Sequence, residues 1–271
     1  MKLNLLATML ISFMTLTACN GQTGEDETEV MIETNLGNIR IKLYNDTPLH
    51  RDNFIKNVRE GKYDQCTWHR IIRNFMIQAG PQTDNAETDS ADVDTASMIP
   101  AEIRFPQHFH RRGAVAAARE GDDVNPGKKS DPIEFYIVTG RTYTEDGLRE
   151  LRYAAEQQQA EVFYQKKQEE NKDKLEALRR ARDFDGLSDL LQKLQNEAQL
   201  ESSDHPIVDY TSDQKRSFRT VGGAPWLDRE YTVFGEVVEG IKTVIAIERI
   251  KTDKQDRPLA DVKILKAYVV E

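Results

Sequence analysis

The sequence predicts a mainly β fold that is interrupted by an inserted α-helical hairpin. Apolar and polar residues alternate over residues 30–43 and 262–270, and two short apolar runs, residues 68–72 and 75–79, flank a turn signal. Both patterns are typical of strands. Residues 144–200 contain no proline and are rich in Glu, Gln, Lys, Arg, Ala and Leu, which is the composition of long helices. At 271 residues the chain is long enough for one domain of good size and an additional segment.

The N-terminus has the order of charge and hydrophobicity that is typical of a secretory signal. Lys2 precedes an apolar run over residues 5–16, which is shorter than the roughly 20 residues that a membrane-spanning helix needs. The run ends in Leu-Thr-Ala-Cys, which resembles the lipobox of bacterial lipoproteins, with Cys19 as the lipidated residue. We therefore expect residues 1–18 to be a signal peptide and residues 19–29 a flexible linker. An ordinary signal peptide with a chance cysteine is the alternative.

The first alternating stretch predicts a β-hairpin followed by a helix. Residues 30–43 alternate on both sides of a turn at Asn-Leu-Gly-Asn, residues 35–38. Thr47 then offers a capping hydroxyl directly before Pro48, and Gly61 ends the apolar stripe that follows. One helix is therefore expected between this hairpin and the next strands.

The stretch over residues 68–80 carries the best candidates for functional residues. Residues 68–80 read Trp-His-Arg-Ile-Ile-Arg-Asn-Phe-Met-Ile-Gln-Ala-Gly, which predicts two strand-like pieces around an Arg-Asn turn. Because side chains alternate along a strand, Phe75 and Ile77 are expected on one face and Met76 and Gln78 on the other. From the pattern alone, the run is a half-buried hairpin with a surface arginine.

This run resembles the signature of the cyclophilin family of peptidyl-prolyl cis-trans isomerases, Phe-His-Arg-x-Ile-x-x-Phe-Met-x-Gln-x-Gly, with Trp68 in place of the first Phe. Far along the chain, residues 226–235 resemble the family run Trp-Leu-Asp-Gly-x-His-x-Val-Phe-Gly, with Tyr231 in place of the His. The resemblance implies an eight-stranded antiparallel closed barrel capped by two helices. It also implies a rotamase that acts on proline-containing polypeptides without a metal or other cofactor.

The resemblance implies a role for particular residues of this chain. Arg70 and Gln78 would be catalytic, and the substrate-binding positions would be Phe75, Met76, Ala117, Ala118, Glu134, Tyr136, Trp226, Leu227 and Tyr231. Ala117 stands where many members have Met and Arg119 where many have Asn, so we expect a shallower or more cationic groove. Glu134 replaces the usual Gln, and its carboxylate would either hold the Arg70 guanidinium in place or neutralise it.

The resemblance covers two parts of the chain and leaves an insertion between them. The barrel is expected over residues 30–143 and 218–271, with a charged helical insertion over residues 144–217. A break at residues 183–186 with an N-cap predicts a helical hairpin, after which His-Pro at residues 205–206 predicts an extended link. The mixed charge of the hairpin fits either a solvated spacer or an arm that binds a protein partner or a second copy.

Gly240 begins a second short helix in the predicted order, and the stretch to residue 270 supplies a last strand that pairs with the first hairpin.

A Glu at position 102 and histidines at 108 and 110 do not complete a tetrahedral metal set, so we interpret them as structural or surface residues. Cys66 is interpreted as a packed small residue and not as a nucleophile.

Charge and composition exclude some classes of function. The formal net charge of -9 argues against nucleic-acid binding, which needs clustered Lys and Arg on one face. We expect an isomerase that helps exported proteins fold, anchored by lipid to a bacterial membrane in the cell envelope. The alternatives are a proline-binding or assembly scaffold with weak or no isomerase activity that acts through its helical arm, and a solute-binding lipoprotein.

Overall fold

The computed structural model describes residues 26–81 and 97–270. The elements, in chain order, are β1 (Glu29–Thr34), β2 (Gly37–Leu43), α1 (Pro48–Arg59), β3 (Thr67–Ile72), β4 (Met76–Gly80), β5 (Ala114–Ala117), β6 (Phe135–Val138), α2 (Glu145–Glu170), α3 (Lys172–Ala181), α4 (Phe184–Asp204), α5 (Ser212–Thr220), the 3-10 turn η1 (Pro225–Leu227), β7 (Val233–Glu239), α6 (Ile241–Glu248) and β8 (Ile264–Val269). Eight strands form one antiparallel sheet in the order β3-β4-β6-β5-β7-β2-β1-β8.

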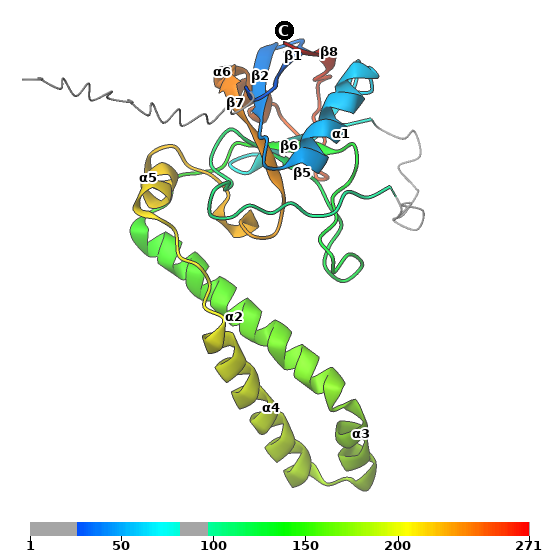
Figure 1. Cartoon of the computed structure of the whole chain (residues 1–271), viewed down its shortest axis with the longest axis vertical. Helices are drawn as coiled ribbons and strands as arrows, with labels where there is room; N and C mark the ends of the chain where they lie inside the picture. Colours follow the sequence, from blue (N-terminus) through cyan, green and yellow to red (C-terminus); the bar gives the residue numbers. More distant parts are fainter. Residues whose placement is uncertain (1–25, 82–96, 271) are drawn as a thin grey trace, which may run out of the picture.

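This sheet curls into a nearly closed barrel (Figure 1). Its two end strands meet where Thr67 bridges Lys263 and where the Trp68 amide donates to the Val262 carbonyl at 2.9 Å. Alternate side chains of the strands fill the interior, and buried side chains of α1 and α6 pack into the same core. The predicted eight-stranded barrel with two flanking helices is therefore confirmed.

The start of α1 is capped differently from what the sequence predicts. The Thr47 hydroxyl makes no cap and instead donates to the Tyr44 carbonyl at 3.3 Å. The Glu102 carboxylate, which comes from a distant loop, accepts hydrogen bonds from the amides of Leu49 (3.1 Å) and His50 (3.0 Å). A negative charge at this end is favoured because the amides of the first turn are unpaired and carry the positive end of the helix dipole. The prediction of a threonine cap was wrong because a loop residue reaches the helix end.

Replacing Glu102 with alanine is expected to lower the free energy of unfolding by about 1 to 3 kcal/mol, since buried donors lose their acceptor. These donors include His50 Nδ1, which lies 2.7 Å from the second carboxylate oxygen. Urea unfolding measures the change, and Glu102→Gln is the control because it keeps one acceptor oxygen. Equal losses in the two variants would contradict the capping role.

The β3–β4 hairpin forms where the sequence predicts it, with one difference at the turn. Ile77 faces the barrel interior as expected, and Met76 faces outward. Phe75 lies in the turn just before β4, where its carbonyl accepts from the amides of Thr139 (3.0 Å) and Gly140 (3.1 Å). Its ring therefore packs with Met76 on the outer face, and the expectation that it shares a face with Ile77 was wrong because a turn residue does not follow the strand alternation.

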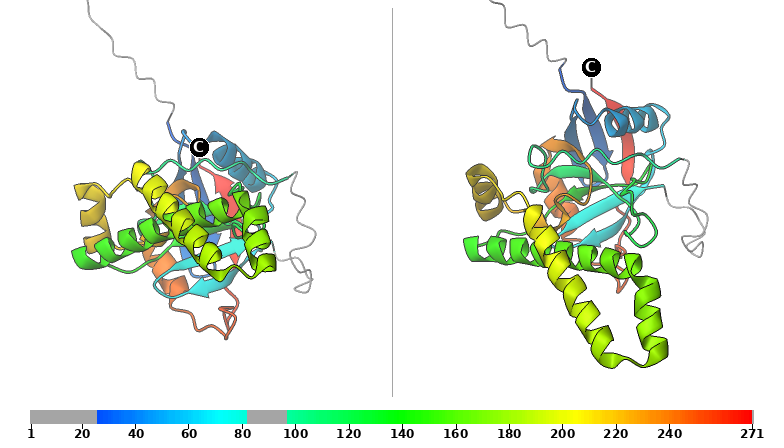
Figure 2. Two further views of the ribbon diagram at one scale, coloured as in Figure 1. Left: turned by 90° about the horizontal axis from the view of Figure 1, so that it is seen from below. Right: turned by 60° about the horizontal axis from the view of Figure 1, so that its bottom comes forward.

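Helices α2, α3 and α4 form an arm that projects from the barrel, with α2 and α4 side by side (Figures 1 and 2). The predicted N-cap at the break is present, since the Asp183 carboxylate accepts from the Gly186 amide at 2.9 Å. The Thr144 hydroxyl also caps α2 and accepts from the Gly147 amide at 3.1 Å. The helical hairpin is therefore confirmed, with α3 as an additional short helix at its far end.

The return from the arm contains a helix that the sequence reading missed. After the extended residues, α5 begins with a capping box in which Thr211 and Gln214 exchange hydrogen bonds. The Thr-x-x-Gln spacing is the signal that would have predicted it. Phe218 of α5 is fully buried, and its ring packs edge-on against Tyr143 and Tyr210 at the base of the arm. Helix α5 therefore crosses the boundary that was expected between residues 217 and 218.

The N-terminal expectations lie outside the described residues. Residues 1–25 hold the expected signal peptide, Cys19 and most of the expected linker. Among the helices of residues 26–81 and 97–270, none combines the length and hydropathy that crossing a bilayer requires.

Candidate active site

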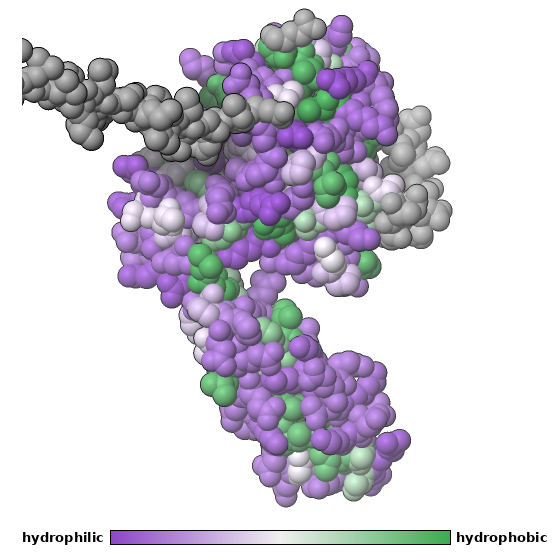
Figure 3. Space-filling model, viewed as in Figure 1, coloured by the Kyte–Doolittle hydropathy of each residue, from purple (hydrophilic) through white to green (hydrophobic). Residues whose placement is uncertain are grey.

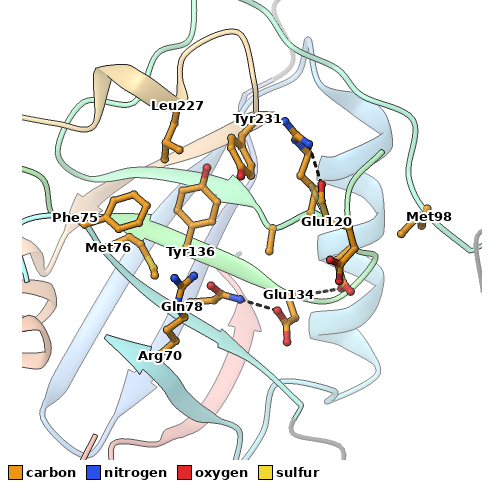
Figure 4. A pocket seen from close by; sticks show the side chains of 13 residues that line it. Arg70, Phe75, Met76, Gln78, Met98, Glu120, Glu134, Tyr136, Leu227 and Tyr231 are labelled. Carbon is orange, nitrogen blue, oxygen red and sulfur yellow. Dashed lines mark hydrogen bonds between the residues drawn. The ribbon is translucent and has the colours of Figure 1, made fainter. Parts of the chain in front are cut away.

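A pocket of about 210 Å³ lies on the outer face of the barrel beside β3, β4 and β6 (Figure 4). Most of the site residues expected from the sequence line it: Arg70, Phe75, Met76, Gln78, Ala118, Glu134, Tyr136, Leu227 and Tyr231. The lining also includes Arg119, which was expected to affect the charge of the groove, and three residues without an expected role, Met98, Glu120 and Asp131. Residues from positions 70 to 231 are thus brought to one site by the pairing of the strands.

Strand register explains why three of these side chains lie in one row. Arg70 of β3 pairs with Gln78 of β4, and Gln78 pairs in turn with Tyr136 of β6. Directly paired residues on neighbouring strands project from the same face of a sheet. The guanidinium, the amide and the phenol ring therefore stand next to one another on a rigid surface.

The Arg70 side chain points into the pocket from below the Gln78 amide (Figure 4). Arg70 is exposed, and within residues 26–81 and 97–270 its guanidinium has no hydrogen bond or ion pair. A guanidinium has five N–H donors and stays protonated. It is therefore available to donate to a ligand in the pocket.

The opposite side of the pocket is apolar. Phe75, Met76, Tyr136 and Leu227 belong to one cluster, in which Met76 is 2% and Tyr136 4% exposed. Figure 4 shows the rings of Phe75 and Tyr136 and the Leu227 side chain around a common space. This surface can hold a small apolar ring next to the guanidinium.

A buried chain of hydrogen bonds fixes the Tyr136 ring. Its hydroxyl lies 3.0 Å from His110 Nε2, and His110 Nδ1 lies 2.8 Å from Asp228 Oδ1, which also accepts from the His110 amide at 2.7 Å. Burial raises the pKa of Tyr136 well above its usual value, so the phenol keeps its proton. Sequence reasoning gave His110 and Asp228 no role at the site. Asp228 lies inside the second family motif, and this was the signal that could have drawn attention to it.

Glu134 contacts Gln78 and not Arg70. Gln78 Nε2 donates to Glu134 Oε2 at 2.6 Å, which leaves the amide oxygen on the side of Arg70 (Figure 4). Burial raises the pKa of Glu134, Asp131 adds to this effect, and the Gln78 hydrogen bond and the charge of Arg70 oppose it. The substituted carboxylate therefore orients the amide, while its charge still acts on Arg70 through space.

Replacing Glu134 with glutamine is expected to raise kcat/KM for a prolyl peptide modestly. A partly exposed charge pair is worth about 0.2 to 1 kcal/mol, so removing the competing charge gives at most about fivefold in rate. The same reasoning predicts that wild-type kcat/KM rises as the pH falls through the raised pKa of Glu134. Burial lowers the pKa of the neighbouring His69.

A pH series between about pH 8 and about pH 5 measures this effect. The Glu134→Gln profile should lose this rise. The control Glu120→Gln removes a charge that adds to the raised pKa of Glu134 but no hydrogen bond to Gln78, so it should keep the rise and shift it to lower pH. A wild-type rate that falls with decreasing pH would contradict the prediction.

Ala117 and Arg119 differ from their expected roles. The Ala117 methyl group is packed in the barrel interior, so the expectation that it binds substrate was wrong; its neighbour Ala118 lines the pocket instead. The Arg119 side chain is 5% exposed and forms ion pairs with Asp122 (2.6 Å) and Glu230 (3.2 Å). Because its charge is compensated, Arg119 does not make the groove more cationic.

Trp226 lies beside the pocket and does not line it. The side chain is 42% exposed, and its ring centroid is 5.4 Å from that of Phe75. Because η1 turns Leu227 into the pocket, the preceding Trp226 faces the other way.

The other polar residues singled out from the sequence have structural contacts. His108 Nε2 lies 2.7 Å from Asp46 Oδ1 and its ring stacks on Tyr44 at 3.8 Å. In the described part of the chain no three His, Cys, Asp or Glu side chains gather as a metal site. Cys66 donates to the Lys62 carbonyl at 3.0 Å, and burial raises the pKa of its thiol.

A nearly closed antiparallel barrel with an exposed arginine beside an apolar pocket on its outer face defines a cyclophilin-type protein. The family model described as "Cyclophilin type peptidyl-prolyl cis-trans isomerase/CLD" matches residues 29–177 and 209–269. The chain belongs to this family and is a peptidyl-prolyl cis-trans isomerase.

Similar proteins agree with this assignment. Proteins of Staphylococcus epidermidis and Staphylococcus aureus, both named "Putative peptidyl-prolyl cis-trans isomerase", are 26% identical over 246 residues, which is 90% of this chain and 93% of the relative. A crystal structure of a cyclophilin-type isomerase from Cryptosporidium parvum aligns with a TM-score of 0.52 at 17% identity and covers 90% of this chain and 98% of its own. A second structure of that protein, determined in the presence of the dipeptide Ala-Pro, aligns with a TM-score of 0.50 at 17% identity over 90% and 99% of the two chains. These structures share the fold.

Proposed function

We propose that this isomerase acts on X-Pro bonds of exported polypeptides outside the cytoplasm, tethered to a bacterial membrane by lipid on Cys19. The observation that carries the catalytic part is the exposed Arg70 guanidinium beside the apolar pocket, which has no hydrogen bond or ion pair among the described residues. The fold relative that was studied with Ala-Pro supports a proline-containing substrate. The location rests on the lipobox-like sequence before Cys19 and the polar run after it.

Arg70 would act on the twisted form of the peptide bond. Rotation faces a barrier of about 18 to 20 kcal/mol because the nitrogen lone pair is shared with the carbonyl. In the twisted state the proline nitrogen regains this lone pair, and a donor aimed at it binds the transition state better than the planar ground state. The free energies of cis and trans X-Pro bonds differ by only about 0.5 to 1 kcal/mol. The isomerase therefore needs no energy source and only has to lower the barrier.

The apolar side of the pocket would supply the rest of the rate enhancement. A charge-assisted hydrogen bond contributes about 1.5 to 3 kcal/mol, which corresponds to about 10- to 100-fold in rate. Phe75, Met76, Tyr136 and Leu227 would hold the proline ring away from water, while Gln78, oriented by Glu134, would bind the peptide group that precedes it.

A protease-coupled assay with an Ala-Pro tetrapeptide tests the catalytic proposal. The protein that begins at Glu25, without the signal peptide and Cys19, should accelerate the cis-to-trans step well above the uncatalysed rate. A rate equal to the uncatalysed one would favour the alternative of a scaffold that acts through its helical arm.

The anchor is tested separately by Cys19→Ser in a bacterial host that is fed labelled palmitate. The wild-type protein should carry the label and fractionate with membranes, whereas the variant should not. An unlabelled wild-type protein would overturn the anchor and leave the isomerase proposal standing.

A further inference from the structure

A second and larger hollow, of about 730 Å³, lies between the arm and the barrel. One face of α2, the link over residues 207–210 and the barrel loops over residues 122–128 and 225–230 line it. Figure 3 shows the notch between the barrel and the arm from one side. We call this hollow the arm groove.

The arm groove adjoins the catalytic pocket. Leu227 lines the pocket and the preceding Trp226 lines the groove; Tyr231 lines the pocket and the preceding Glu230 lines the groove. The Trp226 ring also lies 5.4 Å from Phe75 of the pocket. Neighbouring residues of the chain therefore line the two sites. An extended polypeptide advances about 3.3 Å per residue, so a chain with its proline in the pocket reaches the groove within a few residues.

The groove presents apolar side chains that are largely exposed. Val162 of α2 is 58% exposed, Val208 of the link 57% and Trp226 of η1 42%, and all three line the same hollow. Leu151 and Ala155 extend this apolar lining along α2. Exposed apolar surface gathered in a concave site is typical of a binding site for an apolar ligand.

The charged groups of the groove are largely paired with one another. Arg152 forms an ion pair with Asp209 at 3.4 Å, and Lys128 forms one with Glu230. Arg229 donates to the Val208 carbonyl, and its guanidinium lies over aromatic rings. Among the described residues, the groove therefore has neither a strong net charge nor a row of free cations that would select an acidic or a basic ligand.

We propose that the arm groove binds the apolar residues that flank the isomerised proline in the same incompletely folded polypeptide. This inference rests on the proposed function and extends it: the arm is part of the substrate-binding surface, and the preferred substrates carry apolar residues a few positions from the proline. Such segments are exposed in polypeptides before folding and buried after it.

The test compares peptides that share a central Ala-Pro and differ in their flanks. The peptides have about 12 residues, an extended length of about 40 Å. One flank, on the N-terminal or the C-terminal side of the Ala-Pro, contains Leu and Phe in one set of peptides and Ser in the other. Exchange spectroscopy by NMR gives kcat/KM for each. Apolar flanks on one side should raise kcat/KM about tenfold, the gain expected when one apolar side chain is buried.

Val162→Asp should abolish the preference, so that kcat/KM becomes equal for peptides with apolar and with Ser flanks. Val208→Asp, on the opposite wall of the groove, should reduce the same preference. Leu200→Asp is the matched control, because Leu200 is 66% exposed on α4, lies outside the groove and receives the same charge. An equal ratio in Val162→Asp and Leu200→Asp, or no preference for apolar flanks in the wild-type protein, overturns the proposal.

Fluorescence anisotropy of the apolar peptide with Arg70→Ala keeps the two proposals distinguishable. If the isomerase proposal fails, binding that still depends on Val162 supports the groove on its own. Sedimentation that shows a dimer lost in Val162→Asp would mean that a second copy occupies the groove, and would overturn the substrate assignment.

Discussion

Replacing Arg70 with alanine lowers kcat/KM for an Ala-Pro peptide by about 10- to 100-fold, because one charge-assisted hydrogen bond to the transition state is lost. The variant is expected to fold normally, since the exposed guanidinium makes no hydrogen bond or ion pair within the described residues. Protease-coupled kinetics measure the rate, and circular dichroism with a urea titration measures the fold.

Arg73→Ala provides the matched control for Arg70→Ala. Arg73 lies in the same hairpin, is exposed and does not line the pocket, so its removal changes the net charge equally. This control should keep nearly the whole rate. A rate in Arg70→Ala that equals the wild-type rate, or a loss that Arg73→Ala reproduces, would remove Arg70 from the catalytic assignment.

Replacing Asp228 with alanine is expected to lower the free energy of unfolding by about 2 to 5 kcal/mol. The side chains of Asp228 and His110 are 0% and 1% exposed, so the amide and Nδ1 donors of His110 would lose their acceptor in a site that water does not reach. Urea unfolding measures the loss. We also expect a lower kcat/KM, because His110 would no longer hold the Tyr136 hydroxyl in one place.

Asp228→Asn separates the hydrogen bonds from the charge. The asparagine keeps the oxygen that accepts from His110, and its amino group would replace Oδ2, which has no hydrogen-bond partner among the described residues. Its stability should therefore stay much closer to wild type than that of Asp228→Ala. If both variants lose the same free energy, the buried charge and not the pair of hydrogen bonds stabilises the site.

Local pattern predicted much of the barrel. Strand alternation fixed the first hairpin and the last strand, because a sheet with one face in the core requires that period. The same alternation failed at Phe75, since a turn residue follows the geometry of the turn. Helix α5 was not predicted, although the sequence contains its capping box.

For the site, the sequence by itself determined which residue types meet: the run from Trp68 to Gly80 and the run from Trp226 to Gly235 supply six of the thirteen residues that line the pocket. Only the tertiary structure decided how they are partnered. Glu134 was expected near Arg70, but it bonds Gln78 because the register of β4 and β6 places the amide closer.

The distant contacts have the same explanation. Glu102 caps α1 from 52 residues away, and Asp228 reaches His110 across 118 residues. Hydrogen bonds between residues so far apart in the sequence depend on how the barrel closes and where its loops cross. No local periodicity or motif encodes these two features. The sequence alone therefore determined the strands, the helical arm and the residues of the pocket. The closure of the barrel decided which buried polar groups satisfy one another, and it placed the arm beside the pocket.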